Sequence, residues 1–345
     1  MNVNDSHALS VFWGDDGPPP APRAPSQLSA EMTLVEFFHQ YAWPDCLATK
    51  GDCELTRKDY VRSLDYWARL TGNPPISQIT KRTCSQFLRL LRAVEFRGRP
   101  ISDNTVYKHW VVVERLLEWT GPESRSVRQG ADLVDRPPRI QGPRRVHEEP
   151  KPGYSLEDLW HWLQVLPDKA RGIPALHTTE PAAWWRAIIL TFYNTGMRPG
   201  TLFRIRWEFV HGQTLRVPRE MVKGTRRGLL LYLNRPAMDA LEPIRRPAGL
   251  VFRWERWPKG ESTLRNHRDR LQAAAGVPRL DFTAFRRTFI TECGKISPLA
   301  MQLMTGHVGL GLRMAAEHYI DAGQILADAL EKMPQPGPIR QRMLF

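Results

Sequence analysis

Residues 281–320 of the chain read DFTAFRRTFITECGKISPLAMQLMTGHVGLGLRMAAEHYI. The stretch predicts two short helices and contains three side chains suited to phosphate chemistry, namely Arg286, His307 and Tyr319. Arginine presents a planar fork of donors to a phosphate, histidine donates a hydrogen bond or transfers a proton, and a tyrosine hydroxyl can act as a covalent nucleophile. The remainder of the chain has to provide the partners that such a site needs and a surface that holds its substrate.

The composition bounds the number of domains and the kind of partner. A chain of 345 residues with 42% hydrophobic residues is long enough for two globular domains of ordinary size. The formal net charge is +13 and the pI is near 9.9. Because a basic surface attracts phosphates with an energy that falls as salt rises, nucleic acid is the favoured partner. A solvated basic surface without a partner is the alternative.

The cysteines and the apolar runs limit the cofactors and the compartment. Four cysteines occur without a C-x-x-C pair or a matching histidine spacing, at Cys46, Cys53, Cys84 and Cys293. Neither a metal site nor a disulfide framework is expected. No apolar run approaches the roughly 20 residues that span a bilayer, and the N-terminus does not resemble a signal peptide. We expect a cytoplasmic protein that enters no membrane and needs no cofactor.

The N-terminal part predicts an arm and a helical domain. Residues 1–29 include GDDGPPPAPRAPS and have little periodic apolar character, so we expect a disordered arm. Four candidate amphipathic helices follow, and residues 30–121 are predicted to form a compact four-helix domain. The apolar faces contain Leu34, Phe37, Phe38 and Tyr41; Tyr60, Leu64 and Trp67; Phe87, Leu88, Leu91 and Val94; and Val106, Trp110, Val113 and Leu117.

A linker connects this domain to the second one. Residues 122–153 are rich in Pro, Gly and Arg and lack periodicity, which is typical of a linker. Its Arg144 and Arg145 either lie along a nucleic-acid backbone or belong to an exposed tether. The second domain, residues 154–322, then opens with a helix for which Ser155 is the predicted N-cap.

The second domain has mixed helical and strand patterns. A core helix is predicted from about 182 to 194, and Gly196 suits the left-handed C-cap that ends it. TLRVP at 214–218 and GLLLYL at 228–233 predict a small antiparallel sheet. The basic turn between these runs contains Lys223, Arg226 and Arg227. Further helices are expected from about 262 to 275 and from Ser297-Pro298 to Gly306.

Four motifs of the second domain occur in a specific order. TGMRPG carries Arg198, the basic turn carries Lys223, FRRTF carries Arg286, and TGH followed by HYI carries His307 and Tyr319. This order resembles the catalytic domain of the tyrosine recombinase, or phage integrase, family. The resemblance implies a mainly α fold with a small antiparallel β-sheet. In that fold an N-terminal helical core-binding (SAM-like) domain precedes a mixed α/β catalytic domain.

The resemblance also implies a reaction and a role for each residue. Cutting a phosphodiester without a metal or cofactor needs a nucleophile, a clamp on the non-bridging oxygens and an acid for the leaving 5′ hydroxyl. By the resemblance, Tyr319 would attack the phosphate and form a 3′-phosphotyrosyl bond, while Arg198 and Arg286 would hold the phosphate. Lys223 would protonate the leaving oxygen, and His307 would donate a hydrogen bond to the phosphate.

Four of these five residues also have a structural alternative. Arg198 could cap the preceding helix, and Lys223 could belong to a solvated hairpin tip. His307 could interact with a helix dipole, and Tyr319 could pack in a core. The candidate DNA-contacting residues outside the site are Arg144, Arg145, Arg226, Arg227 and Arg287.

Two positions depart from the family pattern. Thr283 stands three residues before Arg286, where the family commonly has histidine or lysine. Thr201 stands three residues after Arg198, where an acid is common. Thr283 and His318 are kept as auxiliary site candidates. The departures leave open a DNA-binding protein of this fold that has lost strand cleavage, and a type IB topoisomerase-like enzyme that nicks and reseals is a further alternative.

The expected partners follow from the same resemblance. It implies double-stranded DNA, closed between the two domains, and a homotetramer on DNA because recombination cuts two duplexes. A monomer in free solution is compatible with this. Residues 323–345 form a C-terminal helix and tail that we expect to be exchanged between protomers. The apolar stripe of this helix consists of Ile325, Leu326, Ala329 and Leu330.

Overall fold

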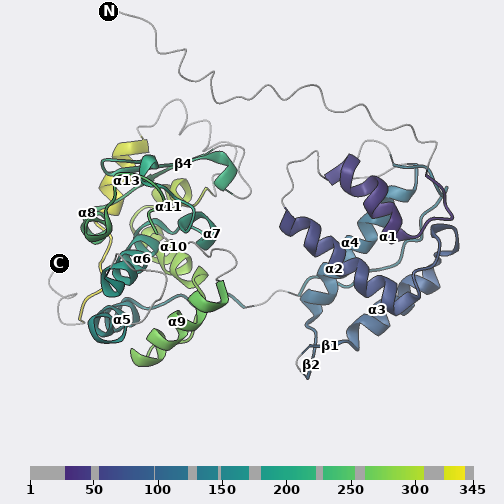
Figure 1. The fold of residues 1–345 in the computed structure, drawn as a ribbon, viewed down its shortest axis with the longest axis horizontal. Coiled ribbons are helices and arrows are strands. Elements are labelled where there is room, and N and C mark those ends of the chain that lie inside the picture. Colours follow the sequence, from purple (N-terminus) through teal and green to yellow (C-terminus); the bar gives the residue numbers. More distant parts are fainter. Residues whose placement is uncertain are drawn as a thin grey trace, which may run out of the picture. The chain divides into compact units, whose positions relative to one another are not determined.

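The computed structural model describes residues 28–47, 54–96, 98–122, 130–146, 149–170, 180–222, 228–252, 261–306 and 322–338. The chain divides into two compact units, Met1–Glu148 and Glu149–Phe345, each with its own hydrophobic core. Figure 1 shows that helices dominate both units and that small antiparallel sheets are their only strands among the described residues. The predicted fold class is therefore confirmed. The predicted arm, residues 1–29, lies almost wholly outside the described residues.

The first unit contains the four predicted helical segments in order. Helix α1 (Leu34–Phe37) continues into the π-helical segment η2 (Phe38–Leu47), and α2 (Glu54–Thr71), η4 (Ile76–Gln78), α3 (Lys81–Arg92) and α4 (Asp103–Thr120) follow. Strands β1 (Glu95–Phe96) and β2 (Arg99–Pro100) form a hairpin between α3 and α4. The apolar faces meet in one core that buries Trp67, Trp110 and Trp119.

Part of the predicted linker packs against α4. The Asn104 side chain donates to the Val146 carbonyl over 3.1 Å and accepts from the Val146 amide over 3.0 Å. At Gly142 the linker backbone lies so close to the helix that a Cβ would come within 2.2 Å of Trp110 Nε1. Residues 130–146 therefore belong structurally to the first unit. Arg144 and Arg145 are exposed on this segment.

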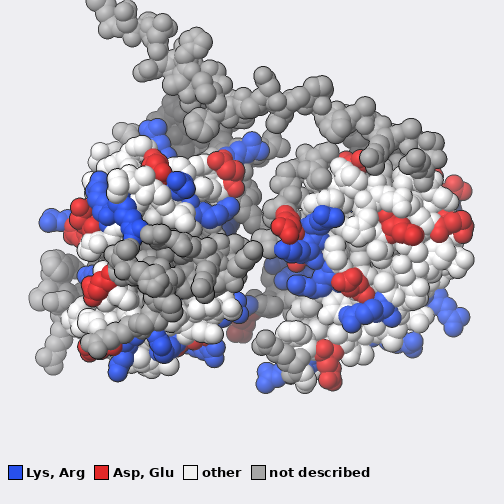
Figure 2. All heavy atoms as spheres, viewed as in Figure 1, with Lys and Arg blue, Asp and Glu red and all other residues white. Residues whose placement is uncertain are grey.

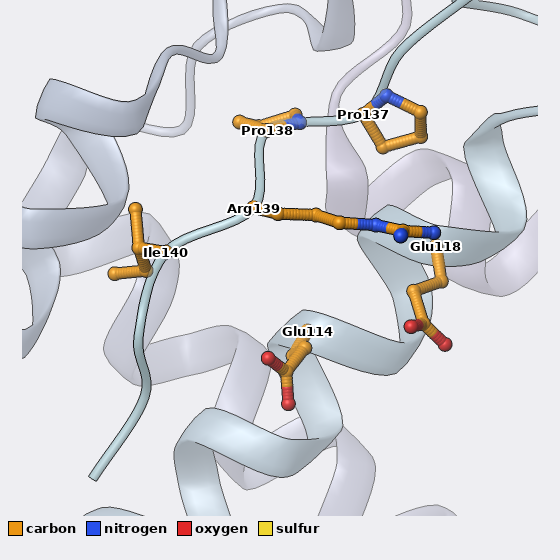
Figure 3. A pocket seen from close by; sticks show the side chains of 6 residues that line it. All are labelled: Glu114, Glu118, Pro137, Pro138, Arg139 and Ile140. Atoms are coloured by element: carbon orange, nitrogen blue, oxygen red, sulfur yellow. The ribbon is translucent and has the colours of Figure 1, made fainter.

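A small hollow lies between α4 and this segment. Figure 3 shows Glu114 and Glu118 on the helix side and residues 137–140 on the other. The lining carries both signs of charge, because Arg139 lies there with the two carboxylates. We assign no ligand to this hollow.

The second unit is organised around α6 (Pro181–Thr195), most of which is buried. Helices α5 (Leu156–Lys169), α8 (Arg235–Leu241) and α10 (Thr283–Ile296) pack against α6. The predicted caps are present, because Ser155 and Asp158 form a capping box on α5 and Gly196 ends α6 with a φ of 59°. The remaining helical elements are α7 (Pro199–Leu202), η5 (Trp207–Phe209), η6 (Arg219–Met221), η7 (Glu242–Ile244), α9 (Glu261–Ala274), α11 (Pro298–Thr305) and α13 (Ala322–Leu330).

The sheet of the second unit has the strand order β3-β4-β5 and is antiparallel. The two predicted runs became β4 (Thr214–Val217) and β5 (Leu229–Tyr232), with Leu215 opposite Leu231. A third strand, β3 (Val210–His211), was not predicted because its two residues are too short for a periodic pattern. None of the described helices is both long and apolar enough to cross a bilayer.

The C-terminal helix α13 packs on its own unit. Its residues Leu326, Ala329 and Leu330 are buried there, against α11 and β5. Asn234 donates to the Leu330 carbonyl over 2.9 Å, and Tyr193 donates to the Pro334 carbonyl. The apolar stripe that suggested exchange between protomers is thus covered within one chain, and exchange stays a prediction.

Glu331, just after α13, joins the C-terminal segment to the sheet side of the unit. Its carboxylate accepts from the Tyr232 hydroxyl over 3.0 Å, the Gln213 amide over 3.1 Å and the Arg235 backbone N–H over 3.2 Å. Burial and then the bond to Glu331 raise the pKa of Tyr232 to about 12, so this hydroxyl stays a donor at neutral pH.

Glu331→Ala is expected to lower the melting temperature of the chain by a few degrees. The change removes three acceptor contacts, but because Glu331 is exposed we expect a loss of only about 1 kcal/mol. Thermal unfolding followed by circular dichroism measures the shift. The neighbouring exposed Lys332→Ala is the matched control and should leave the melting temperature unchanged. Equal melting temperatures for both variants would contradict the proposed anchoring by Glu331.

Candidate active site

Helix α10 places Arg286 inside the second unit. The helix buries Phe285 and Phe289, and the Phe285 ring stacks on Phe192 of α6 with ring centroids 5.3 Å apart. This packing fixes the helix against α6. Arg286 itself is only 6% exposed, although it carries a charge. A buried charge requires partners that compensate its lost hydration.

The Arg286 guanidinium joins two turns of identical sequence. Thr195-Gly196 ends α6 and Thr305-Gly306 ends α11, and both glycines are left-handed, with φ of 59° and 71°. We call these pairs the TG turns. Arg286 Nη1 donates to the Gly196 carbonyl over 2.7 Å, and Nη2 donates to the Thr305 carbonyl over 2.8 Å. One side chain therefore fixes the turn before Arg198 relative to the turn that precedes His307 in the sequence.

Gly196→Ala is expected to lower the melting temperature by about 5 °C or more. A left-handed backbone costs an L-residue about 1–2 kcal/mol, and the new methyl group would lie 2.3 Å from Phe289 Cδ1. The control is Gly200→Ala, because a Cβ there meets nothing within 4 Å. We expect this control to keep or slightly raise the melting temperature. A tolerated Gly196→Ala would contradict the close approach of α6 and α10.

Arg198 lies close to Arg286. It is the half-buried N-cap residue of α7, two residues after the first TG turn. Burial lowers the pKa of Arg286 to about 10, and the neighbouring positive charge of Arg198 adds to this shift. Arg286 therefore remains protonated at neutral pH. The two carbonyl acceptors of Arg286 are uncharged, so those bonds do not neutralise the charge. Adjacent cations in a partly desolvated place favour the binding of an anion.

Helix α7 also holds the segment that leads to Lys223. Thr201 Oγ1 donates to the Met221 carbonyl over 3.1 Å, and Arg204 Nη2 donates to the same oxygen over 3.1 Å. The sequence had suggested only that Thr201 removes a carboxylate from this position. The hydrogen bond from Thr201 to the Met221 carbonyl was not predicted. The signal for it in the sequence is that residue 201, three positions after Arg198, carries a hydroxyl group that can donate.

The structure describes some of the predicted site residues and not others. It brings Arg198 and Arg286 together and leaves Thr283 exposed at the start of α10. The predicted residues outside the described ranges are Lys223, Arg226, Arg227, His307, His318 and Tyr319. Among the described residues, no cluster of three or more His, Cys, Asp or Glu side chains could hold a metal ion.

The predicted DNA-contacting residue Arg287 has a structural contact. Its Nε donates to the Pro152 carbonyl over 2.8 Å, and its Nη2 lies 3.4 Å from Asp281 Oδ1. A DNA contact by Arg287 would compete with these bonds. On the face shown in Figure 2, Lys and Arg side chains gather in several clusters on each unit, with acidic residues between them. Positive charge on this face is therefore spread over both units.

Comparison with solved structures decides the fold. The chain is similar to a lambda integrase dimer bound to a COC' core site, with 16% sequence identity, a TM-score of 0.57, and coverage of 92% of this chain and 85% of the other. The chain has the tyrosine-recombinase fold. No protein-family profile and no curated protein matches it.

Two further structures share the tyrosine-recombinase fold. A lambda integrase tetramer bound to a Holliday junction has 17% identity and a TM-score of 0.56, with coverage of 88% of this chain and 84% of the other. The Tn1549 transposon integrase in complex with transposon right end DNA has 13% identity and a TM-score of 0.53, with coverage of 85% and 98%. At these identities the similarity establishes the fold, and the chemistry has to be argued from the residues themselves.

Proposed function

We propose that the chain is a site-specific DNA recombinase that cuts and rejoins strands through a covalent 3′-phosphotyrosyl intermediate. The observation that carries this proposal is the bridge by Arg286 between the two TG turns, with Arg198 beside it. Two neighbouring arginines suit a phosphate diester, because each can donate to its non-bridging oxygens.

The proposed reaction assigns one task to each residue. The Tyr319 hydroxyl loses its proton to solvent water, and its oxygen forms a bond to phosphorus while the bond from phosphorus to the 5′ oxygen breaks. Arg198 and Arg286 stabilise the negative charge that builds on the non-bridging oxygens. Lys223 gives its proton to the leaving 5′ oxygen, and His307 donates a hydrogen bond to the phosphate. Rejoining is the reverse, with a 5′ hydroxyl attacking the phosphotyrosine.

The proposed partner is double-stranded DNA, on which the chain would assemble as a tetramer. The net charge of +13 supports a polyanionic partner. The solved lambda integrase structures of the same fold contain a dimer on a core site and a tetramer on a Holliday junction. We extend this assembly to the present chain as part of the proposal.

A suicide duplex tests the cleavage step. The full chain first selects its binding site from a random-sequence duplex library, and the selected site is then nicked so that a cleaved strand loses a short fragment. We expect a covalent adduct that survives denaturing detergent and is removed by protease. Stable binding without an adduct would instead support a DNA-binding protein without cleavage. Relaxation of supercoiled plasmid regardless of sequence would favour the topoisomerase-like alternative.

A further inference from the structure

Helix α3 separates its apolar residues completely from its charged ones. It packs against α2 and α4 in the first unit (Figure 1), and the side chains that it buries there are Cys84, Phe87, Leu88 and Leu91. The opposite face holds only exposed cations and exposed neutral polar side chains, namely Lys81, Arg82, Ser85, Gln86, Arg89 and Arg92. No acidic residue occurs anywhere in the helix. We call these six residues the basic face of α3.

The four cations of the basic face have no acidic partner within the part of the chain that the structure describes. Helix α2 of the same unit differs, because its Lys58 pairs with Glu54 over 3.0 Å. It also carries Asp59 and Asp65 among its basic residues. Positive charge that no neighbouring carboxylate neutralises attracts a polyanion. The charge of the first unit is therefore arranged so that α3, and not α2, suits a row of phosphates.

The first turn of α3 opposes the dipole of its own helix. Lys81 and Arg82 are its first two residues and directly follow the N-cap residue Thr80, while no acid stands in this turn. Cations are unfavourable at a helix N-terminus, because this end already carries a partial positive charge. The two side chains are exposed, so they add no burial to the core. Their position therefore favours the binding of an anion and not the stability of the helix.

The length of the basic face suits a nucleic-acid duplex. A helix of 12 residues extends over about 18 Å. A B-form duplex carries one negative charge for about every 1.7 Å of its axis, so a stretch of this length presents on the order of ten phosphate charges. Arginine and lysine side chains on a helix surface are long enough to adapt to phosphates on either side of it. Several contacts can then form at once without a particular base sequence.

We propose that the basic face of α3 binds the phosphate backbone of duplex DNA through its four cations. This inference rests on the proposed recombinase function, from which the duplex is taken as the partner. It assigns to the first unit a contact surface of its own. Because the contacts are made to phosphates, they add affinity for a duplex of any sequence.

The salt dependence of binding counts the phosphate contacts that a variant loses. The full chain binds two fluorescently labelled duplexes of unrelated sequence, and anisotropy gives the association constant at several salt concentrations. For a chain with Arg82→Ala, Arg89→Ala and Arg92→Ala together, we expect the slope of log K against log salt to fall in magnitude by about 2.7, which is about 0.9 for each lost contact. Both duplexes should show the same loss.

Stability separates a DNA-binding role of Arg82 from a structural one. Arg82→Ala alone should reduce the slope by about 0.9, yet its melting temperature should equal that of the wild type or exceed it by up to about 2 °C, because a cation leaves the helix N-terminus. The matched control is Lys58→Ala, which makes the same change of charge on α2. We expect this control to keep the slope of the wild type.

The outcomes separate this inference from the proposed function. A triple variant with the slope of the wild type would overturn the assignment to α3, and so would a Lys58→Ala variant that loses as much slope as Arg82→Ala. In both cases a covalent adduct on the suicide duplex would still support the recombinase. A wild-type chain that binds neither duplex at any salt concentration would overturn the proposed function and this inference together. A loss of slope that is equal on both duplexes, without a loss of melting temperature, supports the inference.

Discussion

Replacing Tyr319 by phenylalanine is expected to abolish the covalent adduct on the nicked suicide duplex. The variant lacks only the hydroxyl oxygen that would bond to phosphorus, so no phosphotyrosine can form. DNA binding should remain close to that of the wild type, because one oxygen contributes little to a contact dominated by phosphate charges. A denaturing gel measures the adduct, and a mobility-shift assay at fixed salt measures binding.

The control for this experiment is Tyr107→Phe, which removes a hydroxyl from α4 in the first unit. We expect this variant to form the adduct at the rate of the wild type. An adduct that persists in Tyr319→Phe would assign the nucleophile to another residue. No adduct in either the wild type or the control would favour the binding protein that has lost cleavage.

Arg286→Lys should reduce the rate of cleavage by about 100-fold to 1,000-fold, the usual effect of losing a donor that stabilises transition-state charge. A lysine has a single ammonium group and cannot hold the carbonyls of Gly196 and Thr305 as a planar fork does. We expect the substitution to weaken the phosphate contact and to fix the two TG turns less firmly relative to each other. Single-turnover cleavage of the suicide duplex measures the rate.

A matched control shows whether this loss is specific to the site. Arg245→Lys changes an exposed arginine that directly follows η7. The Nη1 atom of Arg245 lies 3.1 Å from Glu242 Oε2. We expect its cleavage rate to stay within about twofold of the wild type, because exposed ion pairs contribute little. Near-equal rates for Arg286→Lys and the wild type would contradict the proposed phosphate clamp. Circular dichroism confirms that each variant is folded.

Local signals in the sequence predicted where elements begin and end. Ser155 with Asp158, Gly196, and Ser297-Pro298 with Gly306 all mark the helix ends that the structure contains. Caps are predictable because they depend on residues within a few positions of one another. The two short β-like runs on either side of a basic turn predicted their strands for the same reason.

Contacts between distant residues were not predictable in the same way. Arg286 reaches the Gly196 carbonyl across 90 positions of sequence, and Asn104 reaches Val146 across 42. Such contacts depend on how whole elements pack, which no local pattern encodes. The proximity of Arg198 to Arg286 was expected only from the family resemblance. The roles of the site residues outside the described ranges stay predictions.

The docking of helix α13 limits how far Tyr319, three residues before the helix, can move. Ala322, its first residue, follows Tyr319 by three positions, and three residues of extended chain reach roughly 10 Å at most. While Leu326 and Leu330 remain docked on their own unit, the candidate nucleophile cannot travel beyond that radius. If Tyr319 is the nucleophile, as proposed, attack on any phosphate beyond that reach requires α13 to undock. The free energy of that docking therefore sets a cost on reaching a more distant phosphate.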